Sequence, residues 1–160
     1  MARLRYVSWS EYGELLNTLA NVVASRKERF DMVIGIARGG LPVAMVVSDR
    51  LGVQVDFINV KSYTGIGKRS APEIVSTITE DIRGKRVLVV DDIVDEGDTL
   101  RTVMDHLRSK GPQSIQSAAV FTKPWSKVAA DFSVSIVESW VVFPYERGEV
   151  RRLRGGNPKS

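Results

Sequence analysis

The chain has 160 residues, of which 43% are hydrophobic and 26% charged, with a formal net charge of +4 and no cysteine. These values are typical of one globular domain with a buried core, and they exclude a disulfide framework, a thiolate metal site and a fibrous protein. No segment approaches the roughly 20 apolar residues of a membrane span, and residues 1–6 lack the apolar stretch of a secretory signal. We therefore expect a cytoplasmic protein that does not associate with membranes.

The basic residues are partly concentrated in the C-terminal segment 151–160. Such a segment could favour nucleic acid, but a solvated and frayed terminus explains its charge as well. We expect a single domain over residues 1–150, a frayed basic tail over 151–160, and no nucleic-acid partner.

Helical and extended patterns alternate from the start of the chain. Apolar residues recur at helical spacing over residues 12–23, with Ser10 as a possible N-cap. A short buried strand is predicted over residues 32–36. It is followed by a glycine turn at 37–40 and by a helix that begins at Leu41. This order predicts a strand–loop–helix unit.

The middle of the chain continues with extended segments. Residues 54–60 are predicted to form a strand, and the polar stretch 61–72 is the longest predicted loop. Residues 73–78 are compatible with an extended segment, and a turn is predicted at 83–85. The apolar run 86–90 is then predicted to be the central strand of a sheet.

The C-terminal part returns to the same alternation. A helix is predicted over residues 99–109, ended by Gly111, and a strand over 114–121. Two further short strands are predicted near 133–137 and 140–143. Strands that alternate with helices imply an α/β fold with a mainly parallel central sheet flanked by helices.

Ligands of open α/β sheets bind at the carboxyl ends of the strands. Here those ends are the segments 37–40, 61–72, 91–99 and 122–124. Glycines in the first and third segments permit close approach of the backbone to an anion, and the helices that follow present their N-terminal dipoles to it. Two phosphate sites are therefore expected. Neither segment fits the P-loop or dinucleotide-binding pattern, which disfavours a nucleotide triphosphatase or a dinucleotide-binding protein.

Two adjacent acids end the predicted central strand. The carboxylates of Asp91 and Asp92 are suited to accept hydrogen bonds from two neighbouring hydroxyls, such as the 2′- and 3′-hydroxyls of ribose. A metal-binding or merely solvated strand end is the alternative interpretation.

Four motifs, taken together, resemble one family. The run 87–100 resembles the signature of the type I phosphoribosyltransferases, and residues 36–42 are similar to their pyrophosphate loop. Residues 61–63 are similar to the start of their flexible catalytic loop. The segments 121–124 and 140–146 resemble the base-binding segments of the xanthine-guanine branch. The resemblance implies the type I phosphoribosyltransferase fold, with a small C-terminal base-binding hood.

The resemblance implies roles for residues on the side of the phosphoribosyl donor. Asp91 and Asp92 would bind ribose and, through ribose and water, the cofactor Mg²⁺. Other residues would contact the pyrophosphate: Arg38, Gly39, Gly40, Lys61, Ser62 and Tyr63. A simple glycine turn and a flexible solvated loop are the plainer interpretations of the two segments. The family often has a non-proline cis peptide in the first of them.

The 5′-phosphate would lie in the loop that precedes the helix predicted at residue 99. Glu96, Gly97, Asp98 and Thr99 would bind it, mainly through backbone N–H groups. Glu96 occupies a place usually held by Thr or Ser, and Asp98 adds a second carboxylate. Both would oppose a dianion if they faced it, whereas the phosphate site survives if they face solvent or if Asp98 caps the helix.

The purine would contact residues from the second half of the chain. Asp95 would face the base as general acid or base, Lys123 would donate to a 6-oxo group, and Trp140 would stack on the ring. Val141 and Glu146 would contact the edge of the base. A turn-forming aspartate, an exposed surface lysine and a core tryptophan are the respective alternatives.

The implied reaction transfers ribose 5-phosphate from phosphoribosyl pyrophosphate to a 6-oxopurine (guanine, xanthine or hypoxanthine) in purine salvage. Adenine is disfavoured because its amino group would leave Lys123 unpaired. Two alternatives stay open: a phosphoribosyltransferase for adenine or a pyrimidine, and a non-catalytic regulatory protein that senses phosphoribosyl pyrophosphate. The resemblance also implies a homodimer or homotetramer.

Overall fold

The computed structural model describes residues 3–62, 64–65, 68–69 and 71–155. The elements, in chain order, are β1 (Leu4–Tyr6), α1 (Trp9–Ala24), β2 (Met32–Ala37), α2 (Gly40–Leu51), β3 (Gln54–Lys61), β4 (Thr64–Gly65), β5 (Lys68–Arg69), β6 (Glu73–Ser76), β7 (Arg86–Val94), α3 (Asp98–Arg108), β8 (Ser114–Thr122), β9 (Phe132–Ile136), β10 (Trp140–Val142) and α4 (Arg147–Leu153).

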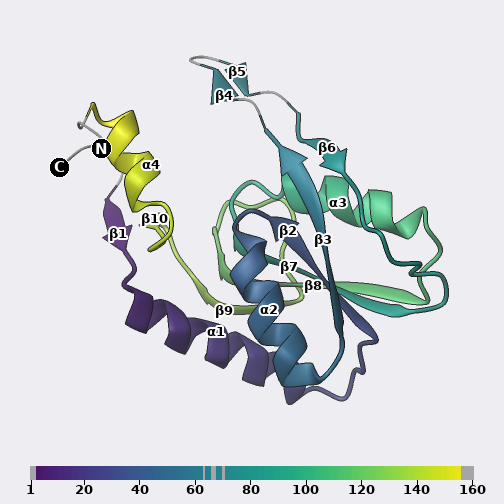
Figure 1. Cartoon of the computed structure of the whole chain (residues 1–160). Helices are drawn as coiled ribbons and strands as arrows, with labels where there is room; N and C mark the ends of the chain where they lie inside the picture. The colour runs from purple at the N-terminus through teal and green to yellow at the C-terminus, as the bar shows by residue number, and fades with distance from the viewer. Residues whose placement is uncertain (1–2, 63, 66–67, 70, 156–160) are drawn as a thin grey trace.

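A six-stranded sheet forms the centre of the molecule, with the strand order β6-β3-β2-β7-β8-β9 (Figure 1). All neighbours in it are parallel except β3 and β6, which are antiparallel. The predicted mainly parallel α/β sheet is therefore confirmed. The central strand β7 continues to Val94, four residues beyond the predicted end at residue 90, so the two acids lie on the strand itself.

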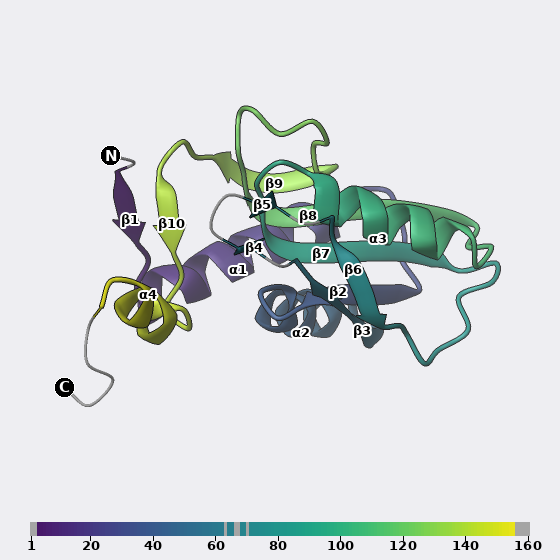
Figure 2. The same cartoon turned by 90° about the horizontal axis from the view of Figure 1, so that it is seen from above.

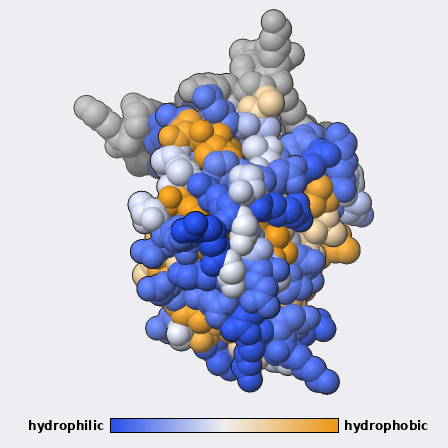
Figure 3. Space-filling view, turned by 90° about the vertical axis from the view of Figure 1, so that its right-hand side faces the viewer, coloured by the Kyte–Doolittle hydropathy of each residue, from blue (hydrophilic) through white to orange (hydrophobic). Residues whose placement is uncertain are grey.

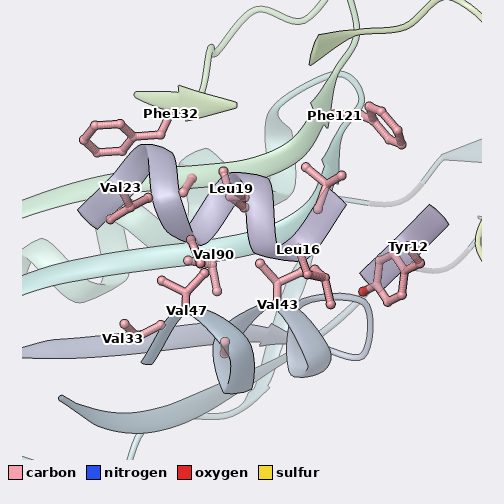
Figure 4. Close-up of a cluster of buried hydrophobic side chains, with 14 of the residues drawn as sticks. Tyr12, Leu16, Leu19, Val23, Val33, Val43, Val47, Val90, Phe121 and Phe132 are labelled. Carbon is pink, nitrogen blue, oxygen red and sulfur yellow. The ribbon is translucent and has the colours of Figure 1, made fainter. Parts of the chain in front are cut away.

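Helices α1 and α2 cover one face of the sheet, and α3 covers the other (Figures 1 and 2). In the core of the first face, Leu16, Leu19 and Val23 of α1 meet Val43 of α2 and Val90 of β7 (Figure 4). All of them are at most 5% exposed. This packing fixes the two helices to the strands whose ends carry the acids and glycines discussed above.

The opposite face is packed against α3 by the alternate residues of the same strands. Val87 and Val89 point to this side, whereas Leu88 and Val90 point to the other. Leu100, Val103, Met104 and Leu107 form the buried stripe of α3. The stripe follows the helical period, and it fixes the start of α3 directly beyond the end of β7.

A small second layer, the hood, consists of β1, β10 and α4 and lies beside the C-terminal ends of the strands (Figure 2). Strands β1 and β10 pair in parallel, with Leu4 opposite Trp140 and Tyr6 opposite Val142. The extended segment predicted near residues 140–143 is thus present, but it pairs with β1 and does not join the central sheet. The sequence analysis did not predict β1.

Other local differences are small. The N-cap of α1 is Ser8, whose hydroxyl accepts the N–H of Glu11 at 3.1 Å, so the prediction of Ser10 was wrong by half a turn. The segment expected to be a loop over 61–72 contains the antiparallel pair β4–β5. Helix α4 crosses residue 150, after which the frayed tail was expected, and residues 156–160 lie outside the described part of the chain.

The surface agrees with the composition of the chain. None of the helices in the described residues has both the length and the apolar character needed to cross a membrane. The face in Figure 3 is mainly hydrophilic, with hydrophobic side chains in small separate areas.

Candidate active site

The loops that follow β2 and β7 touch each other at the carboxyl end of the sheet. A Cβ atom added to Gly39 would lie 2.2 Å from Oδ2 of Asp92, and one added to Gly40 would lie 2.6 Å from the carbonyl oxygen of Val90. Only glycine permits this approach without a shift of the acid or the strand. The peptide bond between Ala37 and Arg38 is cis, as the resemblance to the family implied.

Asp91 and Asp92 are held by hydrogen bonds at the end of β7. Oδ1 of Asp91 accepts the N–H of Asp92 at 2.9 Å, and Oδ1 of Asp92 accepts the N–H of Ile93 at 2.7 Å. The hydroxyl of Tyr145 donates to Oδ2 of Asp92. Asp92 is only 7% exposed. A merely solvated strand end is therefore not what the structure shows.

Burial makes this pair of acids difficult to ionise. It raises the pKa of Asp91 well above the ordinary value, and the neighbouring charge of Asp92 raises it further. Burial also raises the pKa of Asp92, although the hydrogen bond from Tyr145 opposes the rise. The pKa of the Tyr145 hydroxyl is itself raised by burial, so this group stays protonated at neutral pH and acts as a hydrogen-bond donor. Hydroxyl donors or a cation would offset the cost of the two charges.

The donor set suits Mg²⁺ held through substrate and water. Within the described residues, no three His, Cys, Asp or Glu side chains come together as a metal cage. Mg²⁺ usually keeps several waters and is bound by one or two carboxylates together with substrate phosphates. Asp91 and Asp92 supply two such carboxylates, which fits the indirect metal role that the resemblance implied.

The loop between β7 and α3 has the geometry of an anion site. Gly97 has a φ of 91°, and a Cβ atom there would lie 2.9 Å from Cβ of Val128. Helix α3 begins at Asp98, so the first backbone N–H groups of the helix, including that of Thr99, have no acceptor within it. These groups are free to bind a phosphate.

The structure also shows the contacts of Glu96 and Asp98, the two unusual acids of this loop. Asp98 binds Nη2 of Arg101 at 2.7 Å, one turn along its own helix. Its charge is thereby partly neutralised, although it does not cap α3 through its side chain. Glu96 is half-buried and lines the cavity described next, and its carbonyl oxygen accepts the N–H of Lys127 at 3.1 Å.

Two adjoining cavities lie at this edge of the sheet. The first, of about 300 Å³, is lined by Ser62, Pro72, Asp91, Ile93, Val94, Asp95, Glu96, Gly97, Asp98, Thr99, Leu100 and Trp140. The second, of about 200 Å³, is lined by Ile93, Asp95, Lys123, Trp140, Val141, Phe143, Glu146, Glu149, Val150 and Leu153. Ile93, Asp95 and Trp140 line both. These three side chains can thus be reached from either cavity.

The second cavity brings the predicted base-binding residues together. Lys123 is 6% exposed and its ammonium donates to the carbonyl of Ser139, so the exposed-lysine interpretation is wrong. Burial lowers the pKa of Lys123. Trp140 is 58% exposed, so the core-tryptophan interpretation is wrong as well. Val141 is buried beside it, in the short strand β10.

Glu146 closes one side of the second cavity. Its Oε2 accepts the N–H of Phe143 at 3.1 Å, which ties the turn after β10 together. Burial raises the pKa of the Glu146 carboxyl, and the nearby charge of Arg38 offsets part of that rise. Arg38 itself is exposed. The loop after β2 and the hood are therefore near neighbours.

Asp95 has a partner that the sequence analysis missed. The indole N–H of Trp125 donates to Oδ1 of Asp95 at 2.9 Å. The ammonium of Lys123 lies 5.1 Å from the centre of the same indole ring. An aromatic residue two positions after Lys123 was the available signal for this contact. This bond argues against the alternative interpretation, in which the Asp95 side chain is hydrogen-bonded to the backbone of its own turn.

The remaining candidates lie at the end of β3. Lys61 and Ser62 are exposed, and Ser62 reaches the first cavity. Tyr63 lies outside the described residues. The structure thus brings the predicted donor-side and base-side residues to one edge of the sheet, with Lys61 at its periphery.

Comparison with known proteins identifies the family. Residues 8–148 match the family model of the phosphoribosyl transferase domain. The chain belongs to the phosphoribosyltransferase family. This match confirms the resemblance drawn from the four motifs and identifies the protein as an enzyme of the phosphoribosyltransferase class.

Relatives within this family are similar over most of their length. The chain is 31% identical over 144 residues to a xanthine-guanine phosphoribosyltransferase of Idiomarina loihiensis, which covers 88% of this chain and 86% of the relative. It is 36% identical to a purine phosphoribosyltransferase of Pyrococcus horikoshii of known structure, with a TM-score of 0.79 and coverage of 89% and 93%. A xanthine-guanine-hypoxanthine phosphoribosyltransferase of Helicobacter pylori is 25% identical, with a TM-score of 0.76 and coverage of 96% and 99%.

Proposed function

We propose that this phosphoribosyltransferase transfers ribose 5-phosphate from phosphoribosyl pyrophosphate to a 6-oxopurine in purine salvage. The observation that carries the proposal is the buried ammonium of Lys123 in a cavity that adjoins the acids of β7. A 6-oxo group is a suitable acceptor for a further hydrogen bond from this ammonium. The names of the relatives support the same class of base.

The first cavity suits the phosphoribosyl group. Asp91 and Asp92 would accept the ribose hydroxyls, and the N-terminus of α3 with Gly97 and Thr99 would bind the 5′-phosphate through backbone N–H groups. Because Asp98 is paired with Arg101, only part of its charge opposes the phosphate. The carboxylate of Glu96 would need to stay on the side of the cavity away from the dianion.

The pyrophosphate would lie between the loop after β2 and the end of β3. Gly39 and Gly40 allow the backbone to approach it, while Arg38 and Lys61 supply positive charge. Ser62 and Tyr63 would cover it and exclude water, as the resemblance implies. Asp91 and Asp92 would hold Mg²⁺ indirectly, and the ion would supply positive charge to the leaving group.

The second cavity suits the purine. Trp140 is exposed on the rim and can stack on the ring, while Lys123 lies at its 6-oxo end. Val141 and Glu146 line the same cavity, where they would contact the 2-position that distinguishes guanine, xanthine and hypoxanthine. The polar groups of the cavity would thus select both the class of base and its orientation.

The chemistry needs positioning and charge more than a nucleophile. The bond from C1′ of the sugar to the pyrophosphate oxygen breaks, and the pyrophosphate leaves with the electron pair. A bond from C1′ to a ring nitrogen of the base forms, and the proton of the base is taken by Asp95, which lies between the two cavities. Water must be kept out because it would compete for the same electrophilic carbon.

Pyrophosphate release against a panel of bases tests the proposal. We expect turnover with guanine, xanthine or hypoxanthine in the presence of Mg²⁺ and phosphoribosyl pyrophosphate, and much less with adenine or uracil. Preference for adenine or a pyrimidine would support the second candidate and remove the role given to Lys123. If none of the bases leads to pyrophosphate release but the protein binds phosphoribosyl pyrophosphate tightly, the result would support a non-catalytic sensor.

The environment and assembly of the protein are also proposals. A purine-salvage enzyme of this family is expected to act in the cytoplasm, without nucleic acid or membrane, as a homodimer or homotetramer. Light scattering at micromolar concentration would establish the assembly, and a monomeric mass would contradict it.

A further inference from the structure

Trp125 connects the two polar groups that would act on the base. Its indole N–H donates to Oδ1 of Asp95 at 2.9 Å. The face of the same ring lies 5.1 Å from the ammonium of Lys123. One side chain thus contacts the acid by its edge and the lysine by its face.

Core packing does not account for this tryptophan. Its side chain is 53% exposed, and it lies outside both clusters of buried hydrophobic residues. A large aromatic residue left half in solvent gains little from burial. Its two polar contacts are therefore the part of its environment that depends on an indole.

The bond to Asp95 matters because that acid begins a loop. Asp95 is exposed and follows the last residue of β7, and its side chain would otherwise rotate freely in solvent. A hydrogen bond to a carboxylate is stronger and shorter than a neutral one. Because the bond engages Oδ1 alone, Oδ2 is the oxygen that would reach the base.

The contact with Lys123 fixes the second group. The ammonium is held by the carbonyl of Ser139 and by the electron-rich face of Trp125. A lysine side chain has several rotatable bonds, so two contacts at its head restrict where its protons point. The lysine is then oriented before a base arrives.

We propose that Trp125 is a positioning residue that holds Asp95 and Lys123 in one arrangement for the purine. The proposal rests on the proposed function, since it assigns those two residues to the base. It also makes a separate claim about geometry, namely that the edge and the face of the indole have different tasks. Substitution by phenylalanine removes the N–H and keeps an aromatic face, whereas alanine removes both.

The geometric claim can be tested without turnover. A ¹H–¹⁵N spectrum of the whole protein contains the indole signals of Trp9, Trp125 and Trp140, and Trp125→Phe identifies its own signal by removing it. In Asp95→Ala this signal should move upfield, because the hydrogen bond to a carboxylate is lost, while the signal of Trp9 stays in place. An unmoved Trp125 signal would overturn the inference.

The kinetic claim separates the two tasks. Trp125→Phe should lower kcat about tenfold, as loss of a charged hydrogen bond does, with the KM of the base within about twofold. Trp125→Ala should lower kcat as much and also raise the KM of the base about threefold. The matched control is Trp9→Phe, on the exposed side of α1 and 63% exposed, which should leave both constants unchanged.

A double-mutant cycle decides whether Trp125 acts through Asp95. In the background of Asp95→Asn, the further change Trp125→Phe should cost little, because the acid that the indole positions is already disabled. Independent, multiplicative losses would overturn the inference. Equal melting temperatures of the variants and the wild type would show that the losses of activity are not caused by unfolding. If Trp125→Phe leaves kcat unchanged, the inference is overturned.

The proposed function and the positioning role of Trp125 can be contradicted by different results. If the wild-type protein turns over no base, the proposed function fails, and with it the role in the reaction, while the indole spectrum still reports on the contact. If the wild type is active and the indole signal does not respond to Asp95, the function stands and the positioning role fails.

Discussion

Asp91 and Asp92 combine two opposing demands at the level of single residues. Their carboxylates must be shielded from water to bind hydroxyl groups selectively, yet burial raises the pKa of both. The free protein therefore holds two carboxylates where charge is unfavourable. Residues that bind a ligand well at the expense of stability are a common feature of active sites.

Asp91→Asn should stabilise the protein in the absence of divalent cations and donor. The pKa of Asp91 is raised in the folded state, so its ionisation opposes folding at pH values above the unfolded value of about 3.9 and not below it. At pH 7 we expect a rise in melting temperature of roughly 2–4 °C, about 1 kcal/mol for a chain of this size. The rise should shrink as the pH falls to 3.5, and a pH-independent difference would contradict the explanation.

Asp95→Asn should affect turnover far more than donor binding. The amide keeps the shape of the side chain and can still accept the indole N–H of Trp125, but it cannot take a proton from the base. We expect kcat to fall by roughly 10²–10³-fold, within the range of lost acid–base catalysis. Calorimetric titration with phosphoribosyl pyrophosphate should give a nearly unchanged Kd. An unchanged kcat would remove Asp95 from the mechanism.

The polar residues that sequence reasoning found are those that follow predicted strands. Asp91, Arg38 and Lys123 could be placed at one sheet edge because the carboxyl ends of parallel strands meet there. The hydrogen-bond partners of Asp92 and Asp95 could not be found in the same way. Trp125 and Tyr145 reach Asp95 and Asp92 across 30 and 53 residues of sequence, so only tertiary structure brings them together.

At the level of elements, the turn from β7 to α3 depends on Gly97. Its positive φ turns the chain from the strand into the helix, and the contact with Val128 leaves no room for a side chain. The backbone N–H groups that would bind the 5′-phosphate follow directly after this turn.

Gly97→Ala should therefore destabilise the protein by more than strain at φ alone. Gly52 is a matched control, because it also has a positive φ, 67°, but a Cβ atom there would meet nothing within 4 Å. Gly52→Ala is expected to cost roughly 1–2 kcal/mol. Gly97→Ala should cost about 1–3 kcal/mol more because of the steric contact. Urea unfolding of both variants measures the difference, and equal losses would show that Val128 gives way freely.

The main helices and strands follow from periodicity and glycine positions, with ends shifted by a few residues. Strand β1 could not be predicted in this way, because it has three residues and its partner β10 lies near the other end of the chain. The N-cap of α1 shows a smaller limit. Ser8 and Ser10 have the same capping chemistry, and only the bond to Glu11 distinguishes them.

At the level of the whole molecule, both ends of the chain build the hood that carries Trp140. Asp91 and Thr99, which we propose bind the donor, belong instead to the central strand β7 and to helix α3. The two halves of the site thus have separate structural supports.

Removal of residues 1–6 should impair binding of the base more than binding of the donor. The deletion takes away the strand that pairs with β10 from Trp140 to Val142. We expect the KM of the base to rise roughly tenfold or more, because the residues of β10 that would contact the base are displaced. The KM of phosphoribosyl pyrophosphate should stay nearly unchanged. Tyr6→Ala, which keeps the backbone of β1, is the control. Equal rises in both constants would contradict the separation.

The hydrogen bond from Tyr145 to Asp92 joins these halves. The hood that would contact the base donates a hydrogen bond to the acid that would bind the sugar, so a rearrangement of either group on binding would alter the environment of the other. Thermodynamic linkage makes such an effect reciprocal: the factor by which the donor changes affinity for the base equals the factor by which the base changes affinity for the donor. The order in which the two substrates bind then affects only the rates, because the free energy of forming the ternary complex is the same for either order.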